Sequence, residues 1–161
     1  MLVRKKKMGV AMLVVLILGL TILRENIFLE INAIIDGYEV NKANFYLFYD
    51  VLNSYPVEKL GMLKWVLSIS FIFVIALTTF FALHLWFKKK QYDKITMWFY
   101  FLTIILIAFL VVFTKVFGVF DNMYFILKKI ISFLQSPLPL FILFSVYFYI
   151  TKSADIPNRD K

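Results

Sequence analysis

The sequence WVLSISFIFVIALTTFFALHLWF, residues 65–87, holds no Asp, Glu, Lys or Arg. A helix of that length rises about 1.5 Å per residue and covers the roughly 30 Å hydrocarbon layer of a bilayer. The connector KKKQYDK, at 88–94, leads to a second uncharged run, ITMWFYFLTIILIAFLVVFT, at 95–114. Because so short a connector cannot recross the bilayer, we predict an antiparallel hairpin of spans, about 65–87 and 95–117, with its lysine-rich turn in the cytoplasm.

Composition places the whole chain in the membrane class. Of its 161 residues, 62% are hydrophobic, whereas soluble domains have about 45–50% apolar residues. The formal charge of +8 comes largely from basic clusters beside the apolar runs, where they set orientation and contact anionic lipids rather than nucleic acid. Cysteine is absent, which excludes disulfides, thiol nucleophiles and zinc–thiolate sites. We predict a single membrane domain over residues 1–161, with an all-α fold.

The first apolar run follows a basic cluster. Four cations at 4–7 precede the run at 8–23, and this charge step points the amino terminus to the cytoplasm. The run is short for a span, so a cleaved signal peptide is an alternative. Residues 22–26, ILREN, form no small-residue cleavage site, and Arg24 can extend to the far headgroups. We therefore expect an uncleaved first span at about 8–24.

The segment 25–63 is predicted to be an outer loop, on the side opposite the basic clusters. It carries six acids against two lysines, which agrees with the positive-inside bias. Its apolar residues recur at helical spacing, which predicts two short amphipathic helices at the membrane interface or against a partner. The first contains Ile27, Phe28, Ile31, Ile34 and Ile35 and ends at Asp36-Gly37; the second contains Phe45, Phe48, Tyr49 and Leu52 and precedes Pro56.

The segment after the third span allows two interpretations. Residues 118–135 are too apolar for a solvated loop, although they include Lys128 and Lys129. One interpretation is a re-entrant or interfacial helix followed by a span from Pro137. We favour the other, a fourth helix at about 130–151 kinked by Pro137 and Pro139, because 137–151 alone is short for a span. This completes a four-helix transmembrane bundle with both termini in the cytoplasm.

The apolar runs carry few groups that could perform chemistry. Their polar residues are mostly Ser and Thr, which return hydrogen bonds to their own helix, and the lone His84 lies next to the cytoplasmic lysines, where we interpret it as an interfacial residue. No carboxylate lies at mid-depth to relay protons. We therefore expect no enzymatic activity, no cofactor and no metal site.

The candidate contact residues lie on the outer face. Opposite charges there could form ion pairs in the folded protein, which would hold the loop helices against the bundle. Alternatively, they form a docking surface for a partner or a site for an anionic headgroup. The candidates for contact with a partner or a lipid are Arg24, Glu25, Phe48, Tyr49, Asp50, Lys128 and Lys129.

Several short motifs resemble one family. The run 47–50, LFYD, with Leu52, resembles the LFYDPL-type motif of the small exosortase F system-associated membrane proteins of Bacteroidota, and 124–129, YFILKK, with 135–137, QSP, and 147–149, YFY, is similar to that family's later motifs. Val51 stands where the family has proline, two lysines replace an arginine pair, and Ser136 separates Gln135 from Pro137. The resemblance implies a non-catalytic accessory protein that works beside a membrane-embedded sorting peptidase.

These observations lead to one main hypothesis about function. We expect a non-enzymatic accessory or assembly subunit of an envelope protein-sorting or export system, in the bacterial inner membrane. Its partners would be other integral membrane proteins, including an exosortase-like peptidase, and anionic lipids at the cytoplasmic lysine clusters. Two alternatives are an accessory subunit of another large complex, respiratory or secretory, and a protein that binds a lipid headgroup through its outer charges.

Overall fold

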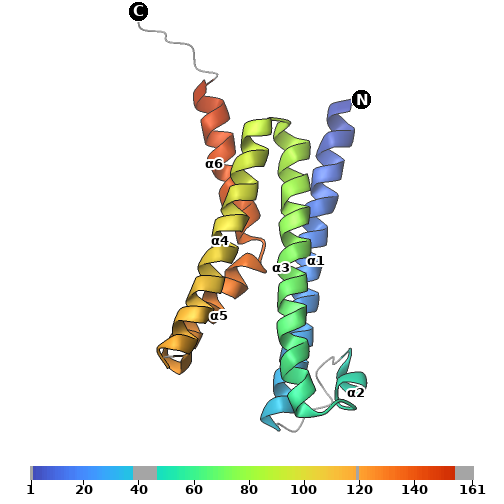
Figure 1. The fold of residues 1–161 in the computed structure, drawn as a ribbon. Coiled ribbons are helices and arrows are strands. Elements are labelled where there is room, and N and C mark those ends of the chain that lie inside the picture. The colour runs from blue at the N-terminus through green and yellow to red at the C-terminus, as the bar shows by residue number, and fades with distance from the viewer. Residues whose placement is uncertain (1, 38–46, 119, 155–161) are drawn as a thin grey trace, which may run out of the picture.

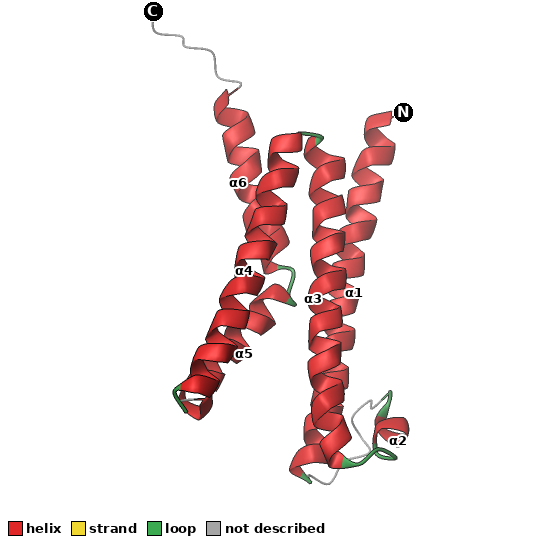
Figure 2. Cartoon of the chain, in the orientation of Figure 1, coloured by secondary structure: helices red, strands yellow, loops and turns green. Residues whose placement is uncertain are grey.

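The computed structural model describes residues 2–37, 47–118 and 120–154. Every regular element in these residues is a helix (Figure 2), which confirms the all-α prediction for this part of the chain. The helices are α1 (Leu2–Asp36), α2 (Tyr49–Leu52), α3 (Val57–Phe87), α4 (Lys90–Val116), α5 (Phe120–Leu134) and α6 (Leu138–Ala154).

Several of these helices are long and apolar enough to cross a membrane. Lys6–Asp36 within α1, α3 and α4 each qualify alone. Met123–Leu134 and Leu138–Ser153 qualify together, as a pair bent by 61°. The described residues therefore contain three candidate spans, or four if the bent pair is one span, as a multi-pass membrane protein requires.

Helices α3 and α4 form the predicted antiparallel hairpin. Its turn consists of Lys88 and Lys89, and Lys88 adopts a left-handed conformation with φ of 53° that closes α3. The amino-terminal end of α1 and the carboxyl-terminal end of α6 lie at the same end of the molecule as this turn (Figure 1). Away from the turn, α4 and α5 diverge from α1 and α3, so the molecule has two legs (Figure 1).

Helices α1 and α3 pack side by side as an antiparallel pair (Figure 1). The phenyl rings of Phe28 and Phe71 lie edge to face at 6.3 Å, and Lys64 Nζ donates a hydrogen bond to Asn32 Oδ1 at 2.6 Å. The candidate spans Lys6–Asp36 and Val57–Phe87 each have 31 residues, about 46 Å of helix. Both helices are therefore longer than the roughly 30 Å thickness of a hydrocarbon layer.

The ends of α1 and α3 away from the lysine-rich turn (Figure 1) differ from the predicted outer loop. Residues 27–35 continue α1 instead of forming a separate helix, and Gly37, with φ of +67°, follows its end as predicted. α3 begins at Val57, well before the uncharged run. Apolar side chains pack together where these ends meet α2, so this end of the α1–α3 pair has a small core of its own. Its buried members are Ile31, Leu52 and Leu60.

Glu30 attaches residues 47 and 48, immediately before α2, to α1. Its side chain is fully buried, and its two carboxylate oxygens accept the backbone N–H groups of Leu47, at 2.7 Å, and Phe48, at 2.9 Å. A buried carboxylate is tolerated when such donors satisfy it. Of the second predicted amphipathic run, only the part around α2 is described; Phe45 and Tyr46 lie outside the described residues.

The fourth predicted helix, 130–151, differs in the structure. Instead of one kinked helix, α5 ends at Leu134 and α6 starts at Leu138. Pro137 disfavours helical geometry in the residue before it and has no N–H to donate. Because Pro137 has no N–H, the Phe133 carbonyl lacks its usual helical donor. The Ser136 hydroxyl donates to this carbonyl at 2.7 Å.

Two tyrosines join α4 to α6 near the lysine-rich turn. The rings of Tyr92 and Tyr147 stack with centroids 4.4 Å apart. The Tyr147 hydroxyl, on a side chain only 1% exposed, lies 3.0 Å from Thr96 Oγ1 and donates to the Tyr92 carbonyl at 3.2 Å. They belong to the main core, with Ile17, Ile75, Ala82, Leu83, Leu140 and Leu143.

Tyr147→Phe is expected to weaken this junction. It removes a buried hydroxyl worth about 1 kcal/mol and should lower the thermal midpoint in neutral detergent by about 2–4 °C. The matched control is Tyr149→Phe, since Tyr149 is 72% exposed and should leave the midpoint unchanged. Equal midpoints for the two variants would contradict the packing described here.

Candidate functional site

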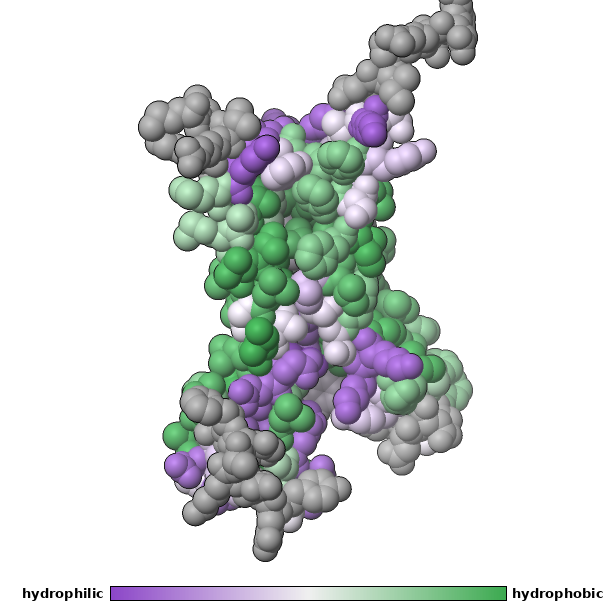
Figure 3. Space-filling view, turned by 180° about the vertical axis from the view of Figure 1, so that it is seen from behind, coloured by the Kyte–Doolittle hydropathy of each residue, from purple (hydrophilic) through white to green (hydrophobic). Residues whose placement is uncertain are grey.

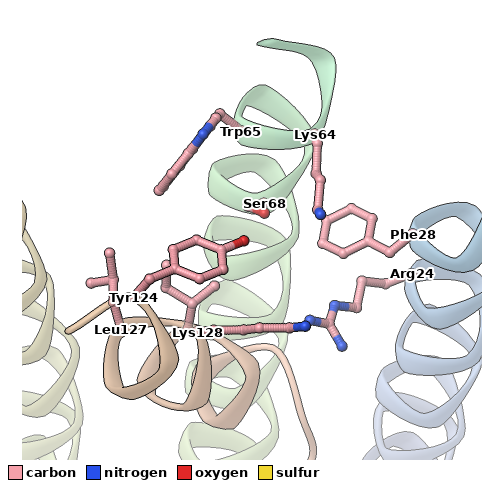
Figure 4. A pocket seen from close by; sticks show the side chains of 9 residues that line it. Arg24, Phe28, Lys64, Trp65, Ser68, Tyr124, Leu127 and Lys128 are labelled. Atoms are coloured by element: carbon pink, nitrogen blue, oxygen red, sulfur yellow. The ribbon is translucent and has the colours of Figure 1, made fainter. Parts of the chain in front are cut away.

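A pocket lies where α1, α3 and α5 face one another (Figure 4). Its lining residues belong to the half of the molecule away from the lysine-rich turn. Its cavity measures about 80 Å³, several times the roughly 10–15 Å³ that one water molecule needs. Cationic, aromatic and aliphatic side chains line it: Arg24, Phe28, Lys64, Trp65, Ser68, Tyr124, Leu127, Lys128 and Ile131. We call it the basic pocket.

Arg24 is the most buried cation of the basic pocket, only 8% exposed. It continues the buried stripe of α1, which repeats every seven residues at Val10, Ile17, Arg24 and Ile31. Its Nη1 forms an ion pair with Glu25, and its guanidinium carbon lies 4.9 Å from the Phe28 ring centroid. Its Nε is buried and has no acceptor among the described residues. A buried donor without an acceptor costs about 1–3 kcal/mol.

Lys64 reaches the basic pocket from α3, one residue before the uncharged run. Asn32 accepts one of its ammonium hydrogens, which leaves two for other acceptors. Lys128 and Arg24 lie close enough to repel the Lys64 ammonium, and Asp36 lies close enough to attract it. The ammonium group is therefore held beside two other cations.

Lys128 and Lys129 are neighbours in sequence with different surroundings. Lys128 shares a face of α5 with Tyr124 and Ile131, which also line the basic pocket, because residues three and four apart align on a helix. Its side chain extends toward the Arg24 guanidinium (Figure 4). Lys129 points elsewhere, with its Nζ 4.3 Å from the centroid of the exposed Phe125 ring.

Gln135, at the break between α5 and α6, ties this region to α3. Its side chain is fully buried, and its Nε2 donates to the backbone carbonyl of Ser68 at 2.8 Å. Its Oε1 has no donor among the described residues. On the rear face, hydrophilic residues extend from one end of the molecule into the notch between its two legs (Figure 3). The Gln135 contact holds α5 against α3 beside the basic pocket.

The structure brings together only some of the candidate residues. Arg24 and Lys128 line the basic pocket, and Glu25 pairs with Arg24. Phe48, Tyr49 and Asp50 lie at α2 and are not among the pocket-lining residues; Phe48 contacts Glu30 through its N–H group. Among the described residues, neither Asp50 nor Lys129 forms an ion pair.

Sequence reasoning missed Lys64, Ser68 and Gln135 as site residues. Lys64 and Ser68 precede Phe71 and Ile75 on the same stripe of α3, at the spacing of one buried helix face. That spacing could have indicated that both face inward. Gln135 gave no comparable signal, because its position depends on the angle between α5 and α6.

A further contact between two ionisable side chains of the described residues spans the lysine-rich turn. His84 Nδ1 lies 2.8 Å from Asp93 Oδ2, and the His84 side chain is half exposed. The interpretation of His84 as an interfacial residue stays a prediction. In the described parts of the chain, no group of three His, Asp or Glu side chains could hold a metal ion.

Comparisons with known protein families, curated proteins and solved structures found no match. The resemblance to the exosortase F system-associated proteins therefore stays a prediction from short motifs.

The basic pocket is suited to binding an anion. Its three cations come from three different helices, and like charges in a partly buried site repel more strongly than in water. An anion between them would replace that repulsion with charge-assisted hydrogen bonds. The described lining residues include no carboxylate.

Removing one of the three cations should stabilise the protein when no anionic lipid is present. Lys128→Met in neutral detergent is expected to raise the thermal midpoint by about 1–3 °C, because it relieves repulsion. The gain should shrink in high salt, which screens charges. Lys129→Met, one position along α5, should have no such effect. A lower midpoint for Lys128→Met than for Lys129→Met would contradict the proximity of the three cations.

Proposed function

We propose that this chain binds the anionic headgroup of a membrane lipid in the basic pocket, and acts through that binding rather than by catalysis. The observation that carries the proposal is the buried Arg24 guanidinium, whose Nε has no acceptor among the described residues. Two lysines, Lys64 and Lys128, lie beside it. A phosphate oxygen would supply the missing acceptor and would be shared readily among three cations.

The depth of the basic pocket supports a lipid as the source of the anion. Lys64 immediately precedes the uncharged run that starts at Trp65, and Arg24 follows the uncharged residues 8–23. Cations at the ends of such runs lie at the level of the headgroups. Trp65, which is half exposed, is also typical of the membrane interface.

We further propose four spans in a bacterial cytoplasmic membrane, with both termini in the cytoplasm and the basic pocket on the outer side. The lysines at 88–90 and the cations at 4–7 support this orientation through the positive-inside bias. The position of the end of α6 beside the α3–α4 turn (Figure 1) supports an even number of crossings, with α5 and α6 as one broken span.

The hypothesis of an accessory subunit in protein sorting or export is compatible with a headgroup-binding role. It is motivated by the resemblance of 47–50 and 124–129 to the exosortase F system-associated proteins, and it stays a prediction. A partner peptidase would be identified by co-purification of the full chain in mild detergent.

Headgroup binding can be measured by native mass spectrometry of the full chain. We expect the protein to retain the anionic lipids phosphatidic acid and phosphatidylglycerol in preference to phosphatidylcholine with the same acyl chains. The double substitution Lys64→Ala and Lys128→Ala should reduce about tenfold the anionic lipid retained beyond that held at the cytoplasmic lysines, because two charge-assisted contacts are lost.

The matched control is Lys59→Ala with Lys129→Ala. It removes one exposed lysine from each of the same two helices and lowers the net charge equally. This control should retain anionic lipid like the unmodified chain, including any lipid held at the cytoplasmic lysines. Equal losses in the two double variants would show that general charge, and not the basic pocket, binds the lipid.

A further inference from the structure

We propose that the ligand of the basic pocket is a lipid with a terminal phosphate monoester, a group that carries close to two negative charges. This inference rests on the proposed headgroup-binding function and names its chemical class. It follows from the charge of the site, from the hydrogen-bond donors that the site offers, and from the size and lining of the cavity.

The charge of the basic pocket exceeds what a phosphodiester would neutralise. Arg24, Lys64 and Lys128 contribute three positive charges. Glu25, through its ion pair with Arg24, offsets one of them; Asp36 also acts on Lys64, but from an exposed position. A diester brings one negative charge, whereas a phosphate monoester carries about −1.5 to −2 at neutral pH. A monoester therefore balances the site more closely.

The available donors match the oxygens of a terminal phosphate. Arg24 Nε has no acceptor among the described residues, Lys64 has two hydrogens beyond its bond to Asn32, and Lys128 makes no hydrogen bond or ion pair with a described residue. These groups come from three directions (Figure 4). A terminal phosphate has three strong acceptor oxygens to meet them, while a diester has only two free oxygens.

The cavity is large enough for a phosphate group. Its volume of about 80 Å³ is several times the space that one water molecule needs. Apolar side chains line the rest of the basic pocket, including Trp65 and Ile131. Because the uncharged run of α3 starts at Trp65, a hydrocarbon tail can follow α3 into the bilayer from there.

Competition between two anionic lipids in nanodiscs of the full chain tests this inference. With equal amounts of phosphatidic acid and phosphatidylglycerol of identical acyl chains, we expect phosphatidic acid to be retained about tenfold more. Near pH 5, below the second phosphate pKa of about 6, phosphatidic acid becomes monoanionic and the preference should largely disappear. The Lys64→Ala, Lys128→Ala variant should lose the preference, whereas the Lys59→Ala, Lys129→Ala control should keep it.

The possible outcomes separate the two proposals. Equal retention of the two anionic lipids, both above phosphatidylcholine, would overturn the monoester inference and leave the proposed headgroup binding standing. If neither anionic lipid is retained in preference to phosphatidylcholine, both the monoester inference and the proposed headgroup binding are overturned.

Displacement by inorganic phosphate distinguishes a lipid from a free phosphate. Millimolar inorganic phosphate is expected to displace little phosphatidic acid, because it lacks the tail. Complete displacement would show that a free phosphate is the ligand and would overturn the lipid assignment.

Discussion

A guanidinium group buried between helices is the constraint on which the rest of the site depends. Arg24 occupies one position of the buried α1 stripe, whose other members are apolar. Glu25 pairs with its Nη1 and the Phe28 ring packs against its guanidinium, but its Nε has no acceptor among the described residues. Burying a charge costs several kcal/mol unless partners compensate it. The nearest additional charges from α3 and α5 are cations, which increase that cost. An anion from outside the chain accounts for the arrangement most simply.

The break between α5 and α6 determines where the third cation lies. Pro137 ends the helical hydrogen bonding, and the two helices bend by 61°. Gln135 then contacts the Ser68 carbonyl, so the face of α5 that carries Lys128 is directed toward α1 and α3. At the opposite end, the Tyr92–Tyr147 stack holds α4 and α6 together. The α3–α4 turn joins the two legs at that end (Figure 1), and the basic pocket lies between α1, α3 and α5 in the other half of the molecule.

The sequence predicts the helices of this protein better than its site. The uncharged runs at 65–87 and 95–114 predict the α3–α4 hairpin because length and hydropathy alone decide a span. The continuation of α1 through residues 27–35 was not predicted, since a change from apolar to amphipathic pattern does not end a helix. Arg24 and Lys128 were identified by their charge, but the same reasoning also selected Lys129, because only the angle of α5 separates the two lysines. Lys64 was treated as the boundary of a span.

The most direct test is the distance from a bound phosphate to the lysines of the basic pocket. Nitrogen–phosphorus dipolar recoupling by solid-state NMR can measure it on the full chain, with ¹⁵N-labelled lysine side chains, in bilayers that contain phosphatidic acid. We predict an N–P separation of about 3–4 Å, since the contact is a charge-assisted hydrogen bond. The signal should fall in the Lys64→Ala, Lys128→Ala variant to the level given by the cytoplasmic lysines, and should fall less in the Lys59→Ala, Lys129→Ala control. An undiminished signal in the first variant, or equal losses in the two, would contradict this prediction.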